Sequence, residues 1–190
     1  TRLMQGIDLL EKAHAANPDH PKFAMELCTA HRLAGNTDTC VRVLNRFLKR
    51  NPNHRSVRLY SARFNIARGE PAAALTDLNK LMEQHPKDPE VNAMLGEVYA
   101  RLHNLPAARQ TYERMHRSSP NQPAWLMRMG TIDLRMKRYD EAARNLQQAY
   151  AKSNEQDFAS LRGLVECYIE SGRPANVLAK VEQYLQGHPK

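Results

Sequence analysis

Two of the three cysteines lie close together in the sequence, in the segment ELCTAHRLAGNTDTCVRVL at residues 26–44. Cys28 and Cys40 are twelve residues apart, with Gly35-Asn36 between them. A zinc site would need about four ligands, and no CxxC motif or paired histidine accompanies these two. Catalytic redox cysteines usually have CxxC spacing, which is also absent. A disulfide and a tight helix crossing filled by two small side chains remain as interpretations.

The other residues that could do chemistry do not form a catalytic motif. The sequence has no phosphate-binding glycine loop, no GxSxG and no HExxH. Its eight histidines are scattered, and carboxylates such as Glu90 and Glu97 stand among basic neighbours, which favours surface ion pairs. We therefore expect a chain that is not an enzyme and that uses no metal and no cofactor.

Positive charge is concentrated in one part of the chain. The formal net charge is +8, and residues 32–68 carry nine basic residues against Asp38 alone, which accounts for the whole excess. Within this segment we define the basic sector as Arg42, Arg46, Lys49, Arg50, Arg55 and Arg58. Such a surface can attract a polyanion or an acidic partner. It can also be a solvated face, or a face that docks on an acidic neighbouring domain.

A 34-residue period organises the elements that must carry these residues. Four prolines stand at this interval, namely Pro18, Pro52, Pro86 and Pro120. Between them lie two apolar-periodic segments of about a dozen residues each, with spacing typical of helices. Turns containing Gly, Asn or Arg, such as AGNTD, RGEPA and LHNLP, separate the two segments. A period of this length indicates a repeat protein built from helix pairs.

The repeats resemble the tetratricopeptide repeat family over essentially all 190 residues. RYDEAARNLQQAY is similar to the family's second helix, and AMLGEVYARL to its first. The resemblance implies an all-α, right-handed α-solenoid of antiparallel helix pairs, with about eleven helices and with the first helices lining a concave groove. We expect a single array: a lone second helix at 3–17, then repeats at 21–54, 55–88, 89–122, 123–157 and 158–190. Both ends look cut, which suggests a segment of a longer array.

The register of the repeats also places the cysteines. Cys28 falls in the column of Gly96 and Gly130, and Cys40 in the column that includes Ala108 and Ala142. The family packs these two columns against each other within one repeat. The resemblance therefore favours two small residues at a close crossing, and the same adjacency keeps a disulfide open.

The resemblance also implies where a partner would bind. Partner peptides of this family usually contact positions 2, 5, 6, 9, 12 and 13 of each first helix. Among these positions we select Met25, Arg32, Tyr60, Arg63, Met94, Arg101, Met127, Arg128, Arg135 and Arg162. Methionines and a tyrosine among arginines form an adaptable apolar strip with planar cations. The methionines could instead complete the packing between repeats.

We expect a non-enzymatic scaffold that binds a partner protein or peptide, of acidic character, in the concave groove, through the basic sector, or both. Two narrower interpretations are a periplasmic scaffold segment of a bacterial exopolysaccharide-export or secretion apparatus, and the substrate-recruiting arm of a larger glycosyltransferase or sulfotransferase. Nucleic acid is not expected, because few exposed aromatic residues could stack bases. The sequence has no run of roughly 18 apolar residues, so we expect no membrane insertion. The cytoplasm and the periplasm both remain open.

Overall fold

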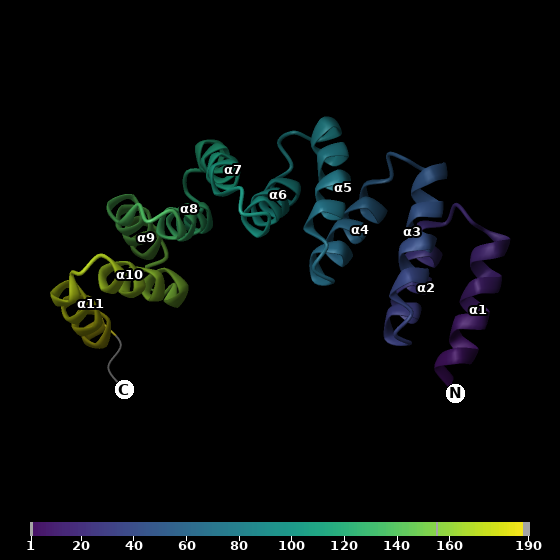
Figure 1. Cartoon of the computed structure of the whole chain (residues 1–190), viewed down its shortest axis with the longest axis horizontal. Helices are drawn as coiled ribbons and strands as arrows, with labels where there is room; N and C mark the ends of the chain where they lie inside the picture. Colours follow the sequence, from purple (N-terminus) through teal and green to yellow (C-terminus); the bar gives the residue numbers. More distant parts are fainter. Residues whose placement is uncertain (1, 155, 188–190) are drawn as a thin grey trace. The chain divides into compact units, whose positions relative to one another are not determined.

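The computed structural model describes residues 2–154 and 156–187, which form helices and no strand (Figure 1). Eleven helices follow one another in this part of the chain: α1 (Arg2–Ala16), α2 (Pro21–Leu33), α3 (Thr37–Arg50), α4 (Arg55–Ala67), α5 (Pro71–Gln84), α6 (Pro89–Arg101), α7 (Leu105–Ser118), α8 (Pro123–Arg135), α9 (Tyr139–Lys152), α10 (Phe158–Glu170) and α11 (Pro174–Gly187). The all-α class predicted from the sequence is confirmed.

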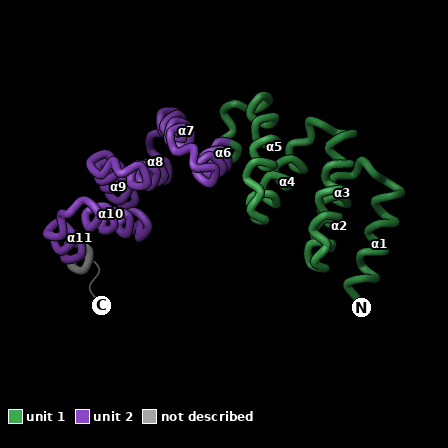
Figure 2. The backbone as a smooth tube through the Cα atoms, viewed as in Figure 1, with its two compact units in different colours: residues 1–91 green, residues 92–190 purple. Residues whose placement is uncertain are grey.

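The helices belong to two compact units, residues 1–91 and 92–190, with the boundary inside α6 (Figure 2). In the first unit α1 packs on α2, α2 packs on α3 and α4, and α4 packs on α5. In the second unit α7 packs on α8, α8 on α9, α9 on α10, and α10 on α11. Each unit is therefore a stack of helices that contact their neighbours in the chain, as expected of a repeat protein. The five repeat boundaries stay a prediction.

The turn inside each helix pair has one recurring backbone geometry. The residue one place beyond the cap of the first helix has positive φ, and these residues are Gly35, Gly69, His103, Lys137 and Gly172. The following N–H then donates back across the helix end, as from Asn36 N to His31 O at 2.8 Å and from Arg138 N to Asp133 O at 2.8 Å. These bonds satisfy carbonyls that the helix end would otherwise leave unpaired. The turn sends the chain back along the helix it has just left.

Small residues allow the two helices of a pair to approach closely. A Cβ at Gly96 in α6 would lie 2.3 Å from the Tyr112 ring in α7, and a Cβ at Gly130 in α8 would lie 2.6 Å from Leu146 Cγ in α9. At Gly130 the carbonyl oxygen of Ala142 would also be only 3.1 Å away. The glycines are thus required by packing, since each place that a side chain would take is filled by the partner helix.

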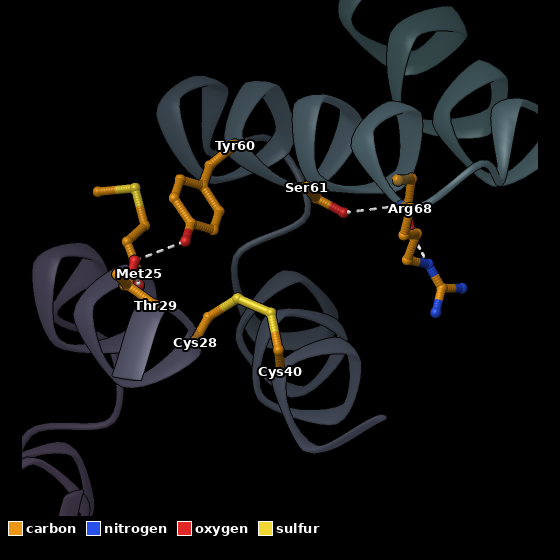
Figure 3. The surroundings of a disulfide bond; sticks show 8 residues. Met25, Cys28, Thr29, Cys40, Tyr60, Ser61 and Arg68 are labelled. Atoms are coloured by element: carbon orange, nitrogen blue, oxygen red, sulfur yellow. Dashed lines mark hydrogen bonds between the residues drawn. A yellow bond between two sulfur atoms is a disulfide. The ribbon is translucent and has the colours of Figure 1, made fainter. Parts of the chain in front are cut away.

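Cys28 and Cys40 occupy the corresponding crossing of α2 and α3, and the structure joins them in a disulfide (Figure 3). Both residues are fully buried. The close crossing expected from the sequence is present, and the disulfide is the alternative that the structure contains. The third cysteine, Cys167 in α10, is free and buried, and burial raises the pKa of its thiol.

A buried ion pair holds α4 to α5 in the first unit. Arg58 Nη1 donates to Asp77 Oδ1 at 2.7 Å, and Arg58 Nε donates to the carbonyl oxygen of Pro52 at 2.6 Å. Ser61 Oγ donates to the other carboxylate oxygen of Asp77 at 2.6 Å. The Arg58 side chain is only 4% exposed. Its charge is therefore used inside the fold and is not presented to a partner.

The second unit has a comparable buried carboxylate that links three helices. Asp133 in α8 is fully buried; its Oδ1 accepts from Arg109 Nε in α7 at 2.7 Å, and its Oδ2 accepts from Asn145 Nδ2 in α9 at 2.8 Å. A buried carboxylate is tolerated when a cation and additional hydrogen bonds satisfy its oxygens. In both units a buried aspartate thus joins helices that follow one another in the chain.

We expect Gly130→Ala to lower the free energy of unfolding by roughly 1–3 kcal/mol, because the new Cβ overpacks the crossing of α8 and α9. The matched control is Gly6→Ala in α1, where a Cβ meets nothing within 4 Å. This change should raise the free energy of unfolding by up to about 1 kcal/mol, because alanine is the better helix former. Denaturant unfolding measures both. Equal effects of the two variants would contradict the close crossing.

We expect Arg58→Met to cost about 3–5 kcal/mol, because it leaves the Asp77 carboxylate buried without its cation. Arg63→Met is the control: it removes an ion pair whose arginine side chain is 64% exposed, and its cost should stay near 0–1 kcal/mol. Denaturant unfolding again provides the measurement. Replacing both Arg58 and Asp77 with apolar residues should recover much of the loss, and a double variant as unstable as the single one would contradict this account.

Thiol titration tests the disulfide. In denaturant without a reductant we expect one reactive thiol per chain, that of Cys167, and three after reduction. In the native protein Cys167 should react slowly, because it is buried and its pKa is raised. Three reactive thiols before reduction, in protein purified without a reductant, would contradict the Cys28–Cys40 bond.

Candidate functional site

Three of the predicted first-helix residues meet in one surface recess of the first unit. We define the first-unit recess as the cavity of ≈ 230 Å³ lined by Met25, Arg55, Ser56, Leu59, Tyr60, Arg63 and Glu90. Met25 comes from α2, and Leu59, Tyr60 and Arg63 come from α4. A thioether and a phenol ring thus stand beside guanidinium groups. That these residues bind a peptide stays a prediction.

Polar contacts fix the side chains of the first-unit recess. The hydroxyl groups of Tyr60 and Thr29 are 2.7 Å apart and share a hydrogen bond, which ties the phenol ring to α2 (Figure 3). Arg63 and Arg55 both donate to Glu90, and Arg55 also donates to Asp88. The guanidiniums are therefore oriented, and Glu90 partly neutralises them.

The Arg55–Asp88 pair stays charged at neutral pH. Burial would raise the pKa of Asp88, but hydrogen bonds from Arg55 and from backbone N–H groups outweigh it and lower that pKa. The hydrogen bonds to Asp88 and Glu90 raise the pKa of Arg55. Arg55 is therefore committed to internal pairing more than to a partner.

Three further predicted residues meet in a recess of the second unit. We define the second-unit recess as the cavity of ≈ 270 Å³ lined by Glu97, Ala100, Tyr112, Met127, Arg128, Thr131, Ile132 and Arg135. Arg128 lies over the Tyr112 ring, 5.6 Å from its centroid. Arg135 donates to the carbonyl oxygen of Ala100 at 3.0 Å. Burial raises the pKa of Tyr112 although Arg128 opposes the shift, so the phenol is neutral at physiological pH.

The other first-helix candidates lie outside both recesses. Met94 is only 9% exposed and therefore completes the packing, which is the alternative that the sequence left open for the methionines. Arg101 pairs with Glu97 one turn earlier on α6, at 2.9 Å. Arg32 and Arg162 are exposed on α2 and α10.

The basic sector divides into two groups. Arg42, Arg46, Lys49 and Arg50 are exposed on α3, and none of them forms an ion pair among residues 2–154 and 156–187. Arg58 is buried against Asp77, and Arg55 is paired with Asp88 and Glu90. The basic surface that remains available is therefore the α3 group, and we leave Arg58 out of it.

Sequence reasoning missed several residues of the recesses. Tyr112 belongs to a second helix, and the positions assigned to partner contact are all on first helices. Its ring nevertheless lies over Gly96 and lines the second-unit recess. Glu90 and Glu97 were expected to form surface ion pairs, and both also line a recess. The sequence did contain one signal for Tyr112: a large side chain in the second helix of a repeat whose first helix has a glycine, Gly96, at the crossing.

Within residues 2–154 and 156–187 no group of three or more His, Cys, Asp or Glu side chains is placed to hold a metal ion. In the same part of the chain no helix is both long and apolar enough to cross a membrane. The candidate sites that include predicted residues are the two recesses and the α3 surface.

Several solved structures are similar to this chain. A tetratricopeptide repeat protein from Parabacteroides merdae is 19% identical with a TM-score of 0.78, over 97% of this chain and 73% of that one. MamA protein is 17% identical with a TM-score of 0.74, over 87% and 90% of the two chains. PilW, a type IV pilus biogenesis factor, is 14% identical with a TM-score of 0.74, over 98% and 86%. At these identities the similarity shows the fold alone, and it confirms the α-solenoid.

Family models give a more specific result. No curated protein sequence matches the chain. A family model described as tetratricopeptide repeat matches residues 65–129 and 133–189, and a second model with the same description matches residues 29–89. Since the first model alone spans more than half of the sequence, the chain belongs to the tetratricopeptide repeat family.

Proposed function

We propose that the chain is a non-enzymatic scaffold, and that the first-unit recess and the second-unit recess each bind an extended segment of a partner protein. Tetratricopeptide repeats support protein–protein interaction. The observation that carries the proposal is that each unit has its own recess in which methionine, tyrosine, arginine and glutamate meet. The same combination in two separate places favours a binding function over incidental packing.

The side chains of the recesses suit a segment that has both apolar and acidic residues. Methionine adapts its shape to an inserted apolar side chain, and a tyrosine supplies contact area with a polar tip. Arginine binds a carboxylate with two parallel hydrogen bonds. Together these groups favour an extended segment in which apolar and acidic residues alternate.

The glutamate of the first-unit recess makes binding there exchangeable. Arg63 pairs with Glu90, and the two side chains are 64% and 37% exposed. An ion pair this exposed contributes about 0–1 kcal/mol, so a partner carboxylate can replace the glutamate at little cost. Arg63 is held in position until a partner arrives.

A narrower candidate is a scaffold in the periplasm of a bacterium, as part of a secretion or export apparatus. The observation in its favour is the Cys28–Cys40 bond, because disulfides persist in oxidising compartments and are rare in the cytosol. PilW, to which the fold is similar, is a type IV pilus biogenesis factor. The disulfide bears on the compartment and leaves the partner open.

A pull-down from source-cell extract tests the proposal with three charge-reversed baits. The recess bait carries Arg63→Glu and Arg135→Glu. The α3 bait carries Arg42→Glu and Lys49→Glu. The control bait carries Arg117→Glu and Arg144→Glu, two arginines that are at least 70% exposed, lie on second helices outside both recesses and, like Arg63, pair with a glutamate. All baits change the net charge equally.

We expect a partner that the wild type and the control bait retain and the recess bait loses, with at least a tenfold drop in recovery. Loss of each contact between charged groups costs about 1.5–3 kcal/mol, so two reversals suffice for this drop. If only the α3 bait loses a partner, the α3 surface and not the recesses is the binding site. Equal recovery on all four baits would overturn binding through either surface.

A further inference from the structure

A separate cavity of ≈ 350 Å³ lies between α1, α2 and α3 in the first unit, and none of its lining residues belongs to the first-unit recess. Its apolar part is formed by Ala15, Pro18, Leu27 and Val43. The volume is within the range of sites that bind small molecules. The cavity can therefore take a compact apolar group.

Three arginines on one side of α3 line this cavity: Arg42, Arg46 and Arg50. They follow one another at intervals of four residues, so their side chains lie in a row about 6 Å apart along the helix. Arg42 donates to Thr39 Oγ1 at 2.7 Å. Within residues 2–154 and 156–187 neither Arg46 nor Arg50 has an ion pair or a side-chain hydrogen bond. Glu11 is the one carboxylate that lines the cavity, so two positive charges are in excess.

Two buried histidines that have ring nitrogens without a hydrogen-bond partner line the same cavity. His14 in α1 is 8% exposed and His31 in α2 is 6% exposed. His14 Nδ1 and both ring nitrogens of His31 are buried and have no hydrogen-bond partner in the part of the chain that the structure describes, although His31 Nε2 lies 3.5 Å from Glu11 Oε1. A buried polar atom without a partner costs about 1–3 kcal/mol. A ligand with polar atoms would remove this cost.

His14 has its own electrostatic reason to be neutral. Burial, and then the charges of Arg50 and Arg46, lower its pKa, and the smaller effect of the Asp19 charge opposes them. Neutral imidazole has one donor and one acceptor nitrogen. His14 can thus bind a polar atom of a ligand without adding to the positive charge of the arginine row.

We propose that this cavity binds a phosphate monoester whose organic part is apolar. A phosphate monoester carries about −1.5 to −2 charges at neutral pH, which matches the two positive charges in excess. Guanidinium groups bind phosphate oxygens with paired hydrogen bonds. The apolar part lies over Leu27 and Val43, and each histidine donates a ring N–H to an oxygen atom of the phosphate ester. This site is independent of the two recesses. The pull-down can therefore fail while the phosphate site is confirmed, and the phosphate site can fail while the pull-down succeeds.

Phenyl phosphate is the probe, because it combines a dianion with a compact apolar ring. Equilibrium binding is followed by ³¹P NMR and by the ring signals of His14 and His31, which are assigned from His14→Gln and His31→Gln. We expect both ring signals to shift on binding. Arg46→Gln should weaken binding about tenfold, because it removes a charge-assisted contact. Lys49→Gln is the matched control: it removes the same charge from an exposed position on α3 that does not line the cavity, and its dissociation constant should equal that of the wild type.

Three comparisons make the proposal refutable. Inorganic phosphate should bind more weakly than phenyl phosphate, and equal affinity would overturn the role of the apolar part. Benzoate, with a single negative charge, should also bind more weakly, and equal affinity would overturn the choice of a dianion. Arg46→Gln with wild-type affinity, or histidine signals that do not move at millimolar phenyl phosphate, would overturn the site itself.

A further arm separates two sources of the same group. The phenyl phosphate group occurs both on a free molecule and on a phosphotyrosine side chain of another protein. A short peptide with one phosphotyrosine is therefore compared with phenyl phosphate. Tighter binding of the peptide assigns the cavity to a phosphorylated partner chain, and tighter binding of phenyl phosphate assigns it to a small molecule. Circular dichroism confirms that each variant is folded.

Discussion

The close contact between the two helices of a pair is the constraint on which the rest of the structure depends. At Gly96 and Gly130 the partner helix fills the place of a side chain, and at Cys28 and Cys40 a covalent bond joins the two helices. The turn of positive φ after each first helix brings the second helix back to make this contact. Because this packing fills the crossings themselves, the recesses and cavities lie beside them.

The sequence predicted the elements well because their signals are local. Prolines at a 34-residue interval and turn residues such as Gly35 and Gly69 act on the backbone where they stand, so helices and turns could be placed without knowing the rest of the fold. The small residues at the crossings were also predictable, because the repeat aligns them in columns. The columns do not tell whether Cys28 and Cys40, which stand in two facing columns, form a disulfide.

Predicting the candidate sites was harder, because the state of a charged side chain depends on which distant residue meets it. Arg58 and Arg46 look alike in the sequence, but Asp77 arrives beside Arg58 from the next helix, and no carboxylate pairs with Arg46 in the described part of the chain. The net positive charge of residues 32–68 therefore includes both arginines that are paired inside the fold and exposed basic residues on α3. One part of it stabilises the fold, and the α3 part is left for a ligand.

Helix α2 separates the two kinds of site that the first unit offers. Met25 lines the first-unit recess, whereas Leu27 and His31 line the cavity beside α3. Successive residues are about 100° apart around a helix, so Leu27 and His31 lie roughly 200–240° from Met25, on the other side of α2. A partner segment and an anionic ligand can therefore be bound at the same time without touching. Any influence of one on the other has to pass through α2, whose position is fixed against α3 by the Cys28–Cys40 bond.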